Sequence, residues 1–495
     1  MPNPAWTASG GAPAQSEGGN KAVQQFFAIL KDSYREAVDG FVIYVMLGLS
    51  AVLIAIAASM SFTPVPPEDA FSAIVPQFNL IVPDKGRSSA ISLEDRNTFK
   101  ASDVETAGGG YKLRLTVTAT TERSREFDPV EAAGGKSDRP KGDSFRSAVA
   151  RWSAVTGETV RVDEKGKVNK NKGAKGIDVA VPTQFTVAEQ RAVTDGQMEE
   201  FLKSQFVMHA DMSATVTRSK SGEEPVYAFD VTTTGGSAVK GWPHATKLFF
   251  GAATLADNAP LGGTLWLIED VVISRFGGTF TLLIGMIITS FFIPNMLRKG
   301  SVDLLISKPV SRSKLLVFKY IGGLTFMFLV TAFTVGGIWF VLAVRSGFWD
   351  PSFLVAIPVL TFTFAILYAL STLTATFTRS AIAAMLISIG FAFFLFVFGQ
   401  IKAASDSDKV EHPNSEPSFL QTYVVDLGHD ALPRTRELDQ LVRRAISSGT
   451  LTPSARKLLI RTEDTPSLAG TFGMSLFHIA WMLGVSCWWF SRRDY

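Results

Sequence analysis

Six long stretches of this sequence contain no Asp, Glu, Lys or Arg, and they restrict the fold more than any other feature. Each has 20 residues or more, and an α-helix of about 20 residues crosses the ~30 Å hydrocarbon core of a bilayer. A soluble protein would need amphipathic partners to cover so many apolar segments. We therefore predict an α-helical membrane protein with six spans, at Phe41–Met60, Phe276–Leu297, Tyr320–Val344, Pro351–Thr378, Ser380–Ile401 and Thr465–Ser491.

Basic residues predict the orientation of these spans, because Lys and Arg are enriched in cytoplasmic loops. With a cytoplasmic N-terminus, twelve basic residues fall in the inner segments, and the one short outer loop holds Arg345 alone. The two other outer segments are too long for the rule to apply strictly, and the second carries nine basic residues. We predict that both termini are cytoplasmic and that the chain lies in the inner membrane of a bacterium, with the first span as an uncleaved signal anchor.

The spans and the loops between them divide the chain into eight segments. Residues 1–20 lack apolar bulk, whereas Val23, Phe26, Phe27 and Leu30 recur at helical spacing. The predicted segments are a disordered cytoplasmic tail (1–20), an interfacial amphipathic helix (21–40), the first span (41–60), an extracytoplasmic domain (61–275), spans two to five (276–401), a second extracytoplasmic segment (402–464), the sixth span (465–491) and a cytoplasmic tail (492–495).

The inserted domain at 61–275 is predicted to have an α+β fold. Alternation of polar and apolar residues is typical of strands, and it occurs at 111–120, 176–186, 206–217 and 226–234. A helix is expected over 187–205, interrupted near Gly196. In the second outer segment, residues 418–427 and 436–446 have helical patterns that are separated by prolines.

The loop between the second and third spans, residues 298–319, is the most informative segment for function. It holds six basic residues around a short apolar turn. Pro309 ends this turn, because proline cannot continue a hydrogen-bonded helix, and Ser311 is a favourable N-cap for the helix that follows. Two interpretations are open for such a loop: a basic linker on the membrane surface, or a docking element for a cytoplasmic partner.

The stretch Ile293–Val330 resembles the ABC-2 type permease family. The family marker is a Leu-Leu-x-Ser/Lys-Lys/Arg-Pro-Val/Ile-Ser-Arg elbow, followed by Lys-Tyr and a long apolar helix. This chain supplies Leu304, Leu305, Lys308, Pro309, Val310, Ser311, Arg312, Lys319 and Tyr320. The charged residues of the 21–40 helix stand where the family has an interfacial helix, and the 61–275 insertion resembles a subset with a large extracytoplasmic domain.

This resemblance implies a permease that exports its substrate, as most of the family does, and that pairs with a dimer of separate ABC ATPase subunits. The permease itself would act as a homodimer or with a paralogue. Loop 298–319 would insert into a groove on the ATPase. Asp303, Lys308 and Arg312 would make the polar contacts, Leu304 and Leu305 would fill the groove, and Pro309 would form the elbow.

The residues themselves also favour an external energy source. A proton-driven pump needs ionisable groups within the membrane, and the six spans offer only His478, Cys487 and tyrosines. The phosphate-binding Gly-x4-Gly-Lys-Ser/Thr pattern is missing, because Val130 stands where Gly135-Lys136-Ser137 would need its first glycine. We expect no enzymatic activity and no cofactor on this chain, with ATP and Mg²⁺ on the partner.

One face of the fourth span carries the hydroxyl residues Thr361, Tyr368, Thr372 and Thr376. They would either line a conduit or form a seam between helices, since Thr in membrane helices usually bonds nearby backbone. The alternative for the whole chain is a non-transporting sensor or scaffold that acts through its outer domain. That domain could also bind a periplasmic partner. A net charge of +3 argues against nucleic acid.

Overall fold

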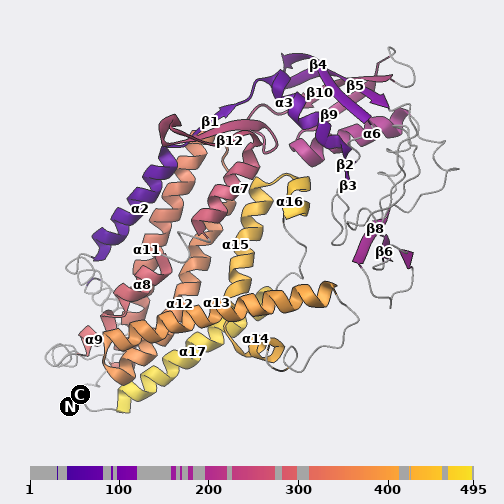
Figure 1. The fold of residues 1–495 in the computed structure, drawn as a ribbon. Helices are drawn as coiled ribbons and strands as arrows, with labels where there is room; N and C mark the ends of the chain where they lie inside the picture. The colour runs from indigo at the N-terminus through magenta and orange to yellow at the C-terminus, as the bar shows by residue number, and fades with distance from the viewer. Residues whose placement is uncertain are drawn as a thin grey trace, which may run out of the picture.

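The computed structural model describes residues 31, 42–81, 91–92, 97–119, 158–162, 168–169, 177–181, 195–219, 226–273, 281–297, 311–411, 423, 425–459 and 467–492. They form a bundle of helices with β-sheets at one end, here named the sheet end (Figure 1). At the opposite end, named the loop end, the helices on either side of residues 298–310 meet. The predicted interfacial helix at 21–40 lies outside the described residues, apart from Lys31.

Among the described residues, four helices are long and apolar enough to cross a membrane. They are α11 (Arg312–Ser346), α12 (Ala356–Thr378, with the 3₁₀ turn η6 at Pro351–Val355 before it), α13 (Ala381–Glu411) and α17 (Leu468–Arg492). They coincide with the third to sixth predicted spans. The first two predicted spans correspond to shorter apolar helices, α2 (Val42–Ala58) and the pair α8 (Thr281–Thr289) and α9 (Phe292–Met296). A helical membrane protein is thus confirmed, and the total of six spans stays a prediction.

Local sequence explains several helix ends. The helical hydrogen bonds are interrupted between α8 and α9, just before Pro294. Proline has no backbone N–H and so cannot donate the next bond of the helix. Ser311 is extended, at φ −64° and ψ 143°, so α11 begins at the next residue. The same helix ends at Gly347, which adopts a left-handed conformation at φ 73° as C-terminal glycines commonly do.

The strands and short helices between α2 and α7 are here named the sheet domain. Its largest sheet is antiparallel and four-stranded, with the order β4-β5-β10-β9. Along β5, Leu113, Leu115 and Val117 are buried, whereas the residues between them are more exposed. The buried side packs against α3, α6 and the π-helical turn η3. The bounds are β4 Asn97–Ala107, β5 Gly110–Ala119, β9 Ser213–Arg218, β10 Val226–Thr234, α3 Pro67–Ile74, α6 Asp195–Gln205 and η3 Phe206–Ala210.

The strands predicted at 111–120 and 226–234 are confirmed by β5 and β10. The strand predicted at 176–186 is confirmed over β8 (Ile177–Val181), which pairs with β6 (Glu158–Val162) next to β7 (Val168–Asn169). The prediction at 206–217 was wrong in its first half, where η3 continues α6 until Asp211 turns left-handed at φ 56°. A short apolar run does not distinguish a buried helical turn from a strand.

A second sheet joins the domain to the bundle. It has the order β1-β11-β12 and contains β1 (Ser61–Pro64), β11 (Pro243–Leu248) and β12 (Ala253–Pro260). Strand β1 follows directly after α2. Arg345, near the end of α11, donates from Nε to the Met60 carbonyl at 2.7 Å. The ends of α2 and α11 are therefore fixed to this sheet.

Two further helices pack along the sheet end of the bundle: α7 (Leu261–Val271), which follows β12, and α15 (Thr435–Thr450) (Figure 1). The sequence prediction had assigned both to extracytoplasmic segments. The structure places their apolar residues in one core with the long helices. This shared core includes Ala57, Leu261, Leu265, Val335, Ile338, Leu342, Phe353, Leu360, Leu438, Val442 and Ile446. The shorter elements nearby are α14 (Leu427–Ala431), α16 (Pro453–Leu459), β2 (Leu80–Ile81) and β3 (Ile91–Ser92).

Candidate functional site

The predicted docking loop is described only at its two bases. Asp303, Leu304, Leu305, Lys308 and Pro309 lie outside the described residues. Arg312 is the first residue of α11.

The two bases of the loop meet in one buried cluster at the loop end. Leu297 directly precedes residues 298–310, and Leu315 and Leu316 follow them by one helical turn. All three belong to the same cluster, together with Ile293, Met296, Ala375, Ala384 and Phe490. These residues come from α9 or the turn after it, α11, α12, α13 and α17. A force applied to residues 298–310 would therefore act on five helices at once.

The contact between α11 and α12 is aromatic and close. The rings of Tyr320 and Tyr368 stack with centroids 5.1 Å apart and an interplanar angle of 9°. The Tyr320 hydroxyl donates to the Ala365 carbonyl at 2.8 Å. Gly323 faces the same ring, and a Cβ added there would lie 2.5 Å from a ring carbon of Tyr368. Glycine at position 323 is what lets the two helices approach this closely.

The four residues considered as conduit lining lie on α12 as their spacing predicts. Thr361 makes a 3.2 Å hydroxyl contact with Thr331 of α11. Tyr368, Thr372 and Thr376 are fully buried. The hydroxyls of Thr372 and Thr376 donate to carbonyls four residues earlier, at 2.8 and 2.7 Å. In this packed arrangement the threonine hydroxyls bond their own helix, and their role as a lining stays a proposal.

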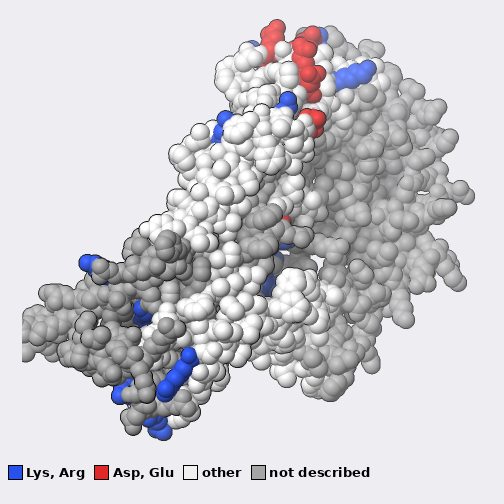
Figure 2. All heavy atoms as spheres, turned by 60° about the vertical axis from the view of Figure 1, so that its left-hand side comes forward, with Lys and Arg blue, Asp and Glu red and all other residues white. Residues whose placement is uncertain are grey.

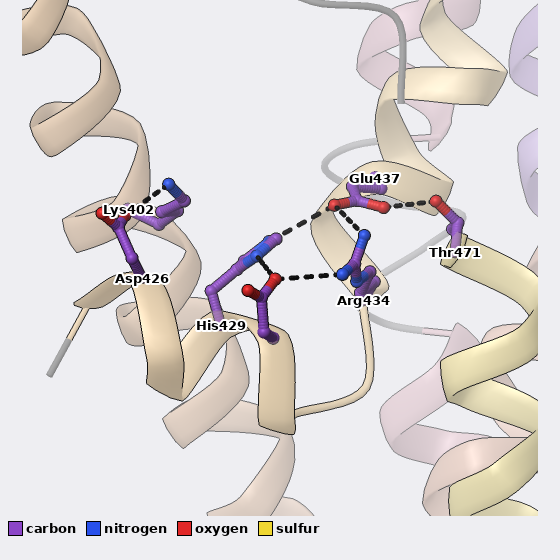
Figure 3. Close-up of polar contacts among 7 residues, drawn as sticks. Lys402, Asp426, His429, Arg434, Glu437 and Thr471 are labelled. Carbon is purple, nitrogen blue, oxygen red and sulfur yellow. Dashed lines mark hydrogen bonds and ion pairs between the residues drawn. The ribbon is translucent and has the colours of Figure 1, made fainter. Parts of the chain in front are cut away.

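A polar network joins α14, α15 and α17, with a neighbouring ion pair on α13 (Figure 3). Glu437 of α15 is its centre. Its carboxylate accepts from the Thr471 hydroxyl of α17 and lies 3.6 Å from Arg434 Nη1 and 3.4 Å from His429 Nε2. Arg434 also binds Asp430 at 3.0 Å.

The adjacent ion pair joins Lys402 of α13 to Asp426, with 2.9 Å between Nζ and Oδ1. The Lys402, His429 and Glu437 side chains are only 12–17% exposed. Burial lowers the pKa of His429 and outweighs the opposing effect of the Glu437 charge. The shielded pair of His429 and Glu437 stabilises a defined position of α14 and α15, because removing one partner would leave a largely buried polar group unpaired.

A second polar group lies near the middle of α15. Asp270 of α7 pairs with Arg443 of α15 at 3.2 Å. The neighbouring Glu269 is 5% exposed, and its Oε2 atom has no hydrogen-bond partner among the described residues. Burial, and then the charge of Asp350, raise the pKa of Glu269 well above its usual range. Asp350 itself accepts from the Ser352 backbone N–H and caps η6. Glu269 is therefore a carboxyl that its surroundings favour in the protonated form.

The sequence interpretation missed both polar groups. Leu438, Val442 and Ile446 recur every four residues in an otherwise charged segment, which signals an amphipathic helix with one buried face. The helix was predicted over 436–446, but its partners were not, because α7 and η6 are distant in sequence and no local pattern pairs it with α17. Among the described residues, no group of three His, Cys, Asp or Glu side chains is arranged to hold a metal ion.

Comparison with known proteins gives one match. A family model described as "ABC-2 family transporter protein" matches residues 159–495. The matched region contains the loop 298–319, the α12 hydroxyl face and the Glu437 network. No curated protein and no solved structure matches the chain.

Proposed function

The chain belongs to the ABC-2 family of transporters, which gives it the role of a membrane permease, and on this premise we propose that it exports its substrate with energy from a separate ATPase. In this proposal α2, the α8–α9 pair and the four long helices make six spans. The loop end and both termini face the cytoplasm of a bacterium. Two copies of the chain, or one copy and a paralogue, act above an ATPase dimer that binds ATP and Mg²⁺.

The buried cluster at the loop end is the observation that carries this proposal. It holds Leu297 and Leu315 together, so the residues on both sides of 298–310 rest on the same packed group of helix ends. Packed interiors transmit displacement because they have low compressibility. We propose that closure of the ATPase dimer pushes this loop through Asp303, Leu304, Leu305, Lys308 and Arg312, with Pro309 forming the elbow, and thereby moves the helix ends.

Helix α11 gives this movement a path to the other end of the bundle. It is a single helix of 35 residues, which at 1.5 Å per residue is about 50 Å long. Leu315 lies in the cluster at its beginning, and Arg345 bonds Met60 at its end. A tilt of α11 at the loop end therefore shifts the β1-β11-β12 sheet. Rigid-body movement of this kind is a common mechanism of switching between states.

The hydroxyl face of α12 enters the proposal as the surface that substrate would meet. Thr361, Tyr368, Thr372 and Thr376 lie along or beside the contact of α12 with its neighbours and are packed in the described arrangement. Separation of α11 from α12 during the transport cycle would expose Thr361 and Tyr368 first, because their partners Thr331 and Tyr320 are on α11.

Purification in mild detergent tests the proposal. We expect the wild-type chain to bring down an ATPase with nucleotide-binding motifs. The double variant Asp303→Arg plus Leu304→Asp should lose this ATPase. It reverses the charge of a residue that would contact the ATPase, and it places a carboxylate in the apolar groove that Leu304 would fill. Both proteins are compared for membrane insertion and monodispersity before the co-purified chains are identified.

The matched control carries the same two changes at the sheet end, as Asp257→Arg plus Leu255→Asp. Both positions are exposed on β12, and this variant should keep the ATPase. Absence of any ATPase from well-folded wild-type protein would contradict the proposal and favour a sensor or scaffold role. If both variants lost the ATPase equally, loop 298–319 could not be assigned as its docking site.

A further inference from the structure

Two phenylalanines are held on the surface where β11 turns into β12. Phe250 is 84% exposed and Phe249 is 55% exposed. No other large apolar side chain among those described is as exposed as Phe250. Phe249, Phe250 and Gly251 all have positive φ, at 51°, 56° and 99°. This conformation is unfavourable for a residue with a side chain, so the turn displays two aromatic rings in a strained backbone.

The end of α2 fixes the position of this turn, here named the Phe turn (Phe249–Gly251). The backbone N–H of Phe250 donates to the Ser59 carbonyl at 2.9 Å, and that of Phe249 donates to the Ser59 hydroxyl at 3.2 Å. Ser59 is the first residue after α2 and its hydroxyl also bonds the Ile56 carbonyl at 2.7 Å. The Phe turn is thus attached where an apolar helix ends.

The exposed side of α2 leads to the Phe turn. Its exposed residues recur every three or four positions, and all of them are uncharged: Tyr44, Val45, Gly48, Ala51, Val52, Ala55 and Ile56. The next position of this stripe is Ser59, which is only 4% exposed and which bonds the Phe turn. The two rings therefore extend the stripe by one helical turn. Figure 2 shows this side of the molecule, where the bundle is mostly uncharged and Lys, Arg, Asp and Glu gather towards its ends.

We propose that the Phe turn inserts into the lipid leaflet at the sheet end and anchors the β1-β11-β12 sheet to the membrane. Lipid is the occupant that the position favours, because the turn continues the exposed face of a helix apolar enough to lie in hydrocarbon. Phenylalanine rings are among the side chains that interfacial segments bury at the boundary between acyl chains and headgroups. The anchor fixes the depth of the β1-β11-β12 sheet relative to the membrane. This is the sheet that a tilt of α11 would shift. This inference depends on the membrane location of the family and not on the ATPase.

A fluorescent probe tests the insertion directly. Cys487 is the only cysteine of the chain, so Cys487→Ser gives a background in which Phe250→Cys can be labelled with an environment-sensitive nitrobenzoxadiazole dye. The labelled protein is reconstituted into phosphatidylcholine nanodiscs. We expect the probe's emission to be blue-shifted. Lipids with a nitroxide near the headgroup should quench it at least twofold more strongly than aqueous iodide does. A probe at Phe249→Cys should give the same result.

The matched control is Asp257→Cys in the same background, an exposed position on β12. It should emit as a hydrated probe and be quenched mainly by iodide. If the probe at position 250 behaves like this control, the turn lies in water and the proposal is wrong. If unlabelled Phe250→Cys instead forms disulfide-linked dimers under mild oxidation and its probe escapes lipid quenching, the turn contacts a second copy and the lipid anchor is excluded. Because neither readout involves ATP, failure here leaves the transport proposal untouched.

Discussion

Single glycines set the distance between neighbouring helices in this bundle. Gly323 lies against the Tyr368 ring, and an added Cβ at Gly337 would lie 2.4 Å from Cδ1 of Ile54 on α2. Small residues let helix backbones approach closely in membrane proteins, where packing has to replace the hydrophobic effect. The paired glycines at 322–323 and 336–337 therefore place one close contact with α12 and one with α2 on the same helix.

Replacing Gly323 by alanine should loosen the contact between α11 and α12. The new methyl group would overlap the Tyr368 ring, and overpacking of this kind costs about 1–3 kcal/mol. Thermal unfolding of the detergent-purified protein measures this loss. The control is Gly336→Ala on the same helix, where an added Cβ meets nothing within 4 Å. An equal shift for both variants would show that helix flexibility, and not the Tyr368 contact, explains the effect.

Glu269 gives a prediction about pH. Its raised pKa means that the folded protein holds a proton over a range in which the unfolded chain has lost it. Stability must then fall as pH rises from the ordinary Glu pKa of about 4.3 towards the raised value. We expect Glu269→Gln to flatten the part of the stability profile that lies above the ordinary Glu pKa, and to stabilise the protein most at the pH where wild-type Glu269 has to ionise on unfolding.

The pH profile of unfolding, recorded for wild type and for Glu269→Gln, checks this sign. Glu200→Gln is the control, because Glu200 is exposed and the same chemical change should leave the profile unaltered. A Glu269→Gln profile that runs parallel to wild type would show that Glu269 is ionised in the folded protein.

At the scale of elements, α15 is the clearest case of a helix positioned by distant partners. Leu438, Val442 and Ile446 pack into the shared core, and Glu437 binds Thr471 of α17. The period of the apolar residues predicted the helix. It did not predict that α7 would cover it, since nothing in either segment specifies a contact across more than 150 residues. The docking loop shows the converse, because its Leu-Leu and Pro-Val-Ser-Arg residues carried the family resemblance, whereas of these only Ser311 and Arg312 are among the described residues.

The Glu437 network should hold α15 to α17. We expect Glu437→Leu and Thr471→Val to destabilise the protein by about 1–3 kcal/mol each, and the double variant to lose less than the sum because each single change removes the Thr471–Glu437 hydrogen bond. Urea unfolding of the four proteins gives the coupling energy. Strictly additive losses would contradict a direct link between the two helices.

At the scale of the whole molecule, the sheet domain and the bundle are joined by a common core. Phe62 of β1 and Leu248 of β11 pack against the cluster that contains Leu342 of α11, Leu261 of α7 and Ile446 of α15. The four-stranded sheet has a separate core of its own around Phe71, Trp242 and Phe229. The domain can therefore stay folded while its connection to the bundle changes.

Gly262 tests this connection. An added Cβ would lie 1.8 Å from the Thr450 carbonyl oxygen, a backbone atom that cannot move aside as a side chain can. We expect Gly262→Ala to separate α7 from α15 and to increase hydrogen exchange in both helices, while the β5 and β10 amides stay protected. Gly263→Ala is the adjacent control, with nothing within 4 Å of the added Cβ. Increased exchange throughout the sheet domain would contradict two separate cores.

The contact between the 298–319 loop and an ATPase is the central claim, and site-specific photocrosslinking in intact cells tests it most directly. Benzoylphenylalanine is placed at Leu304 in the loop and, as the control, at Leu255 on the exposed surface of β12. The account predicts a covalent adduct with a nucleotide-binding ATPase from position 304 and none from position 255. The absence of an ATPase adduct at position 304, with the crosslinker incorporated and the protein in the membrane, would contradict it.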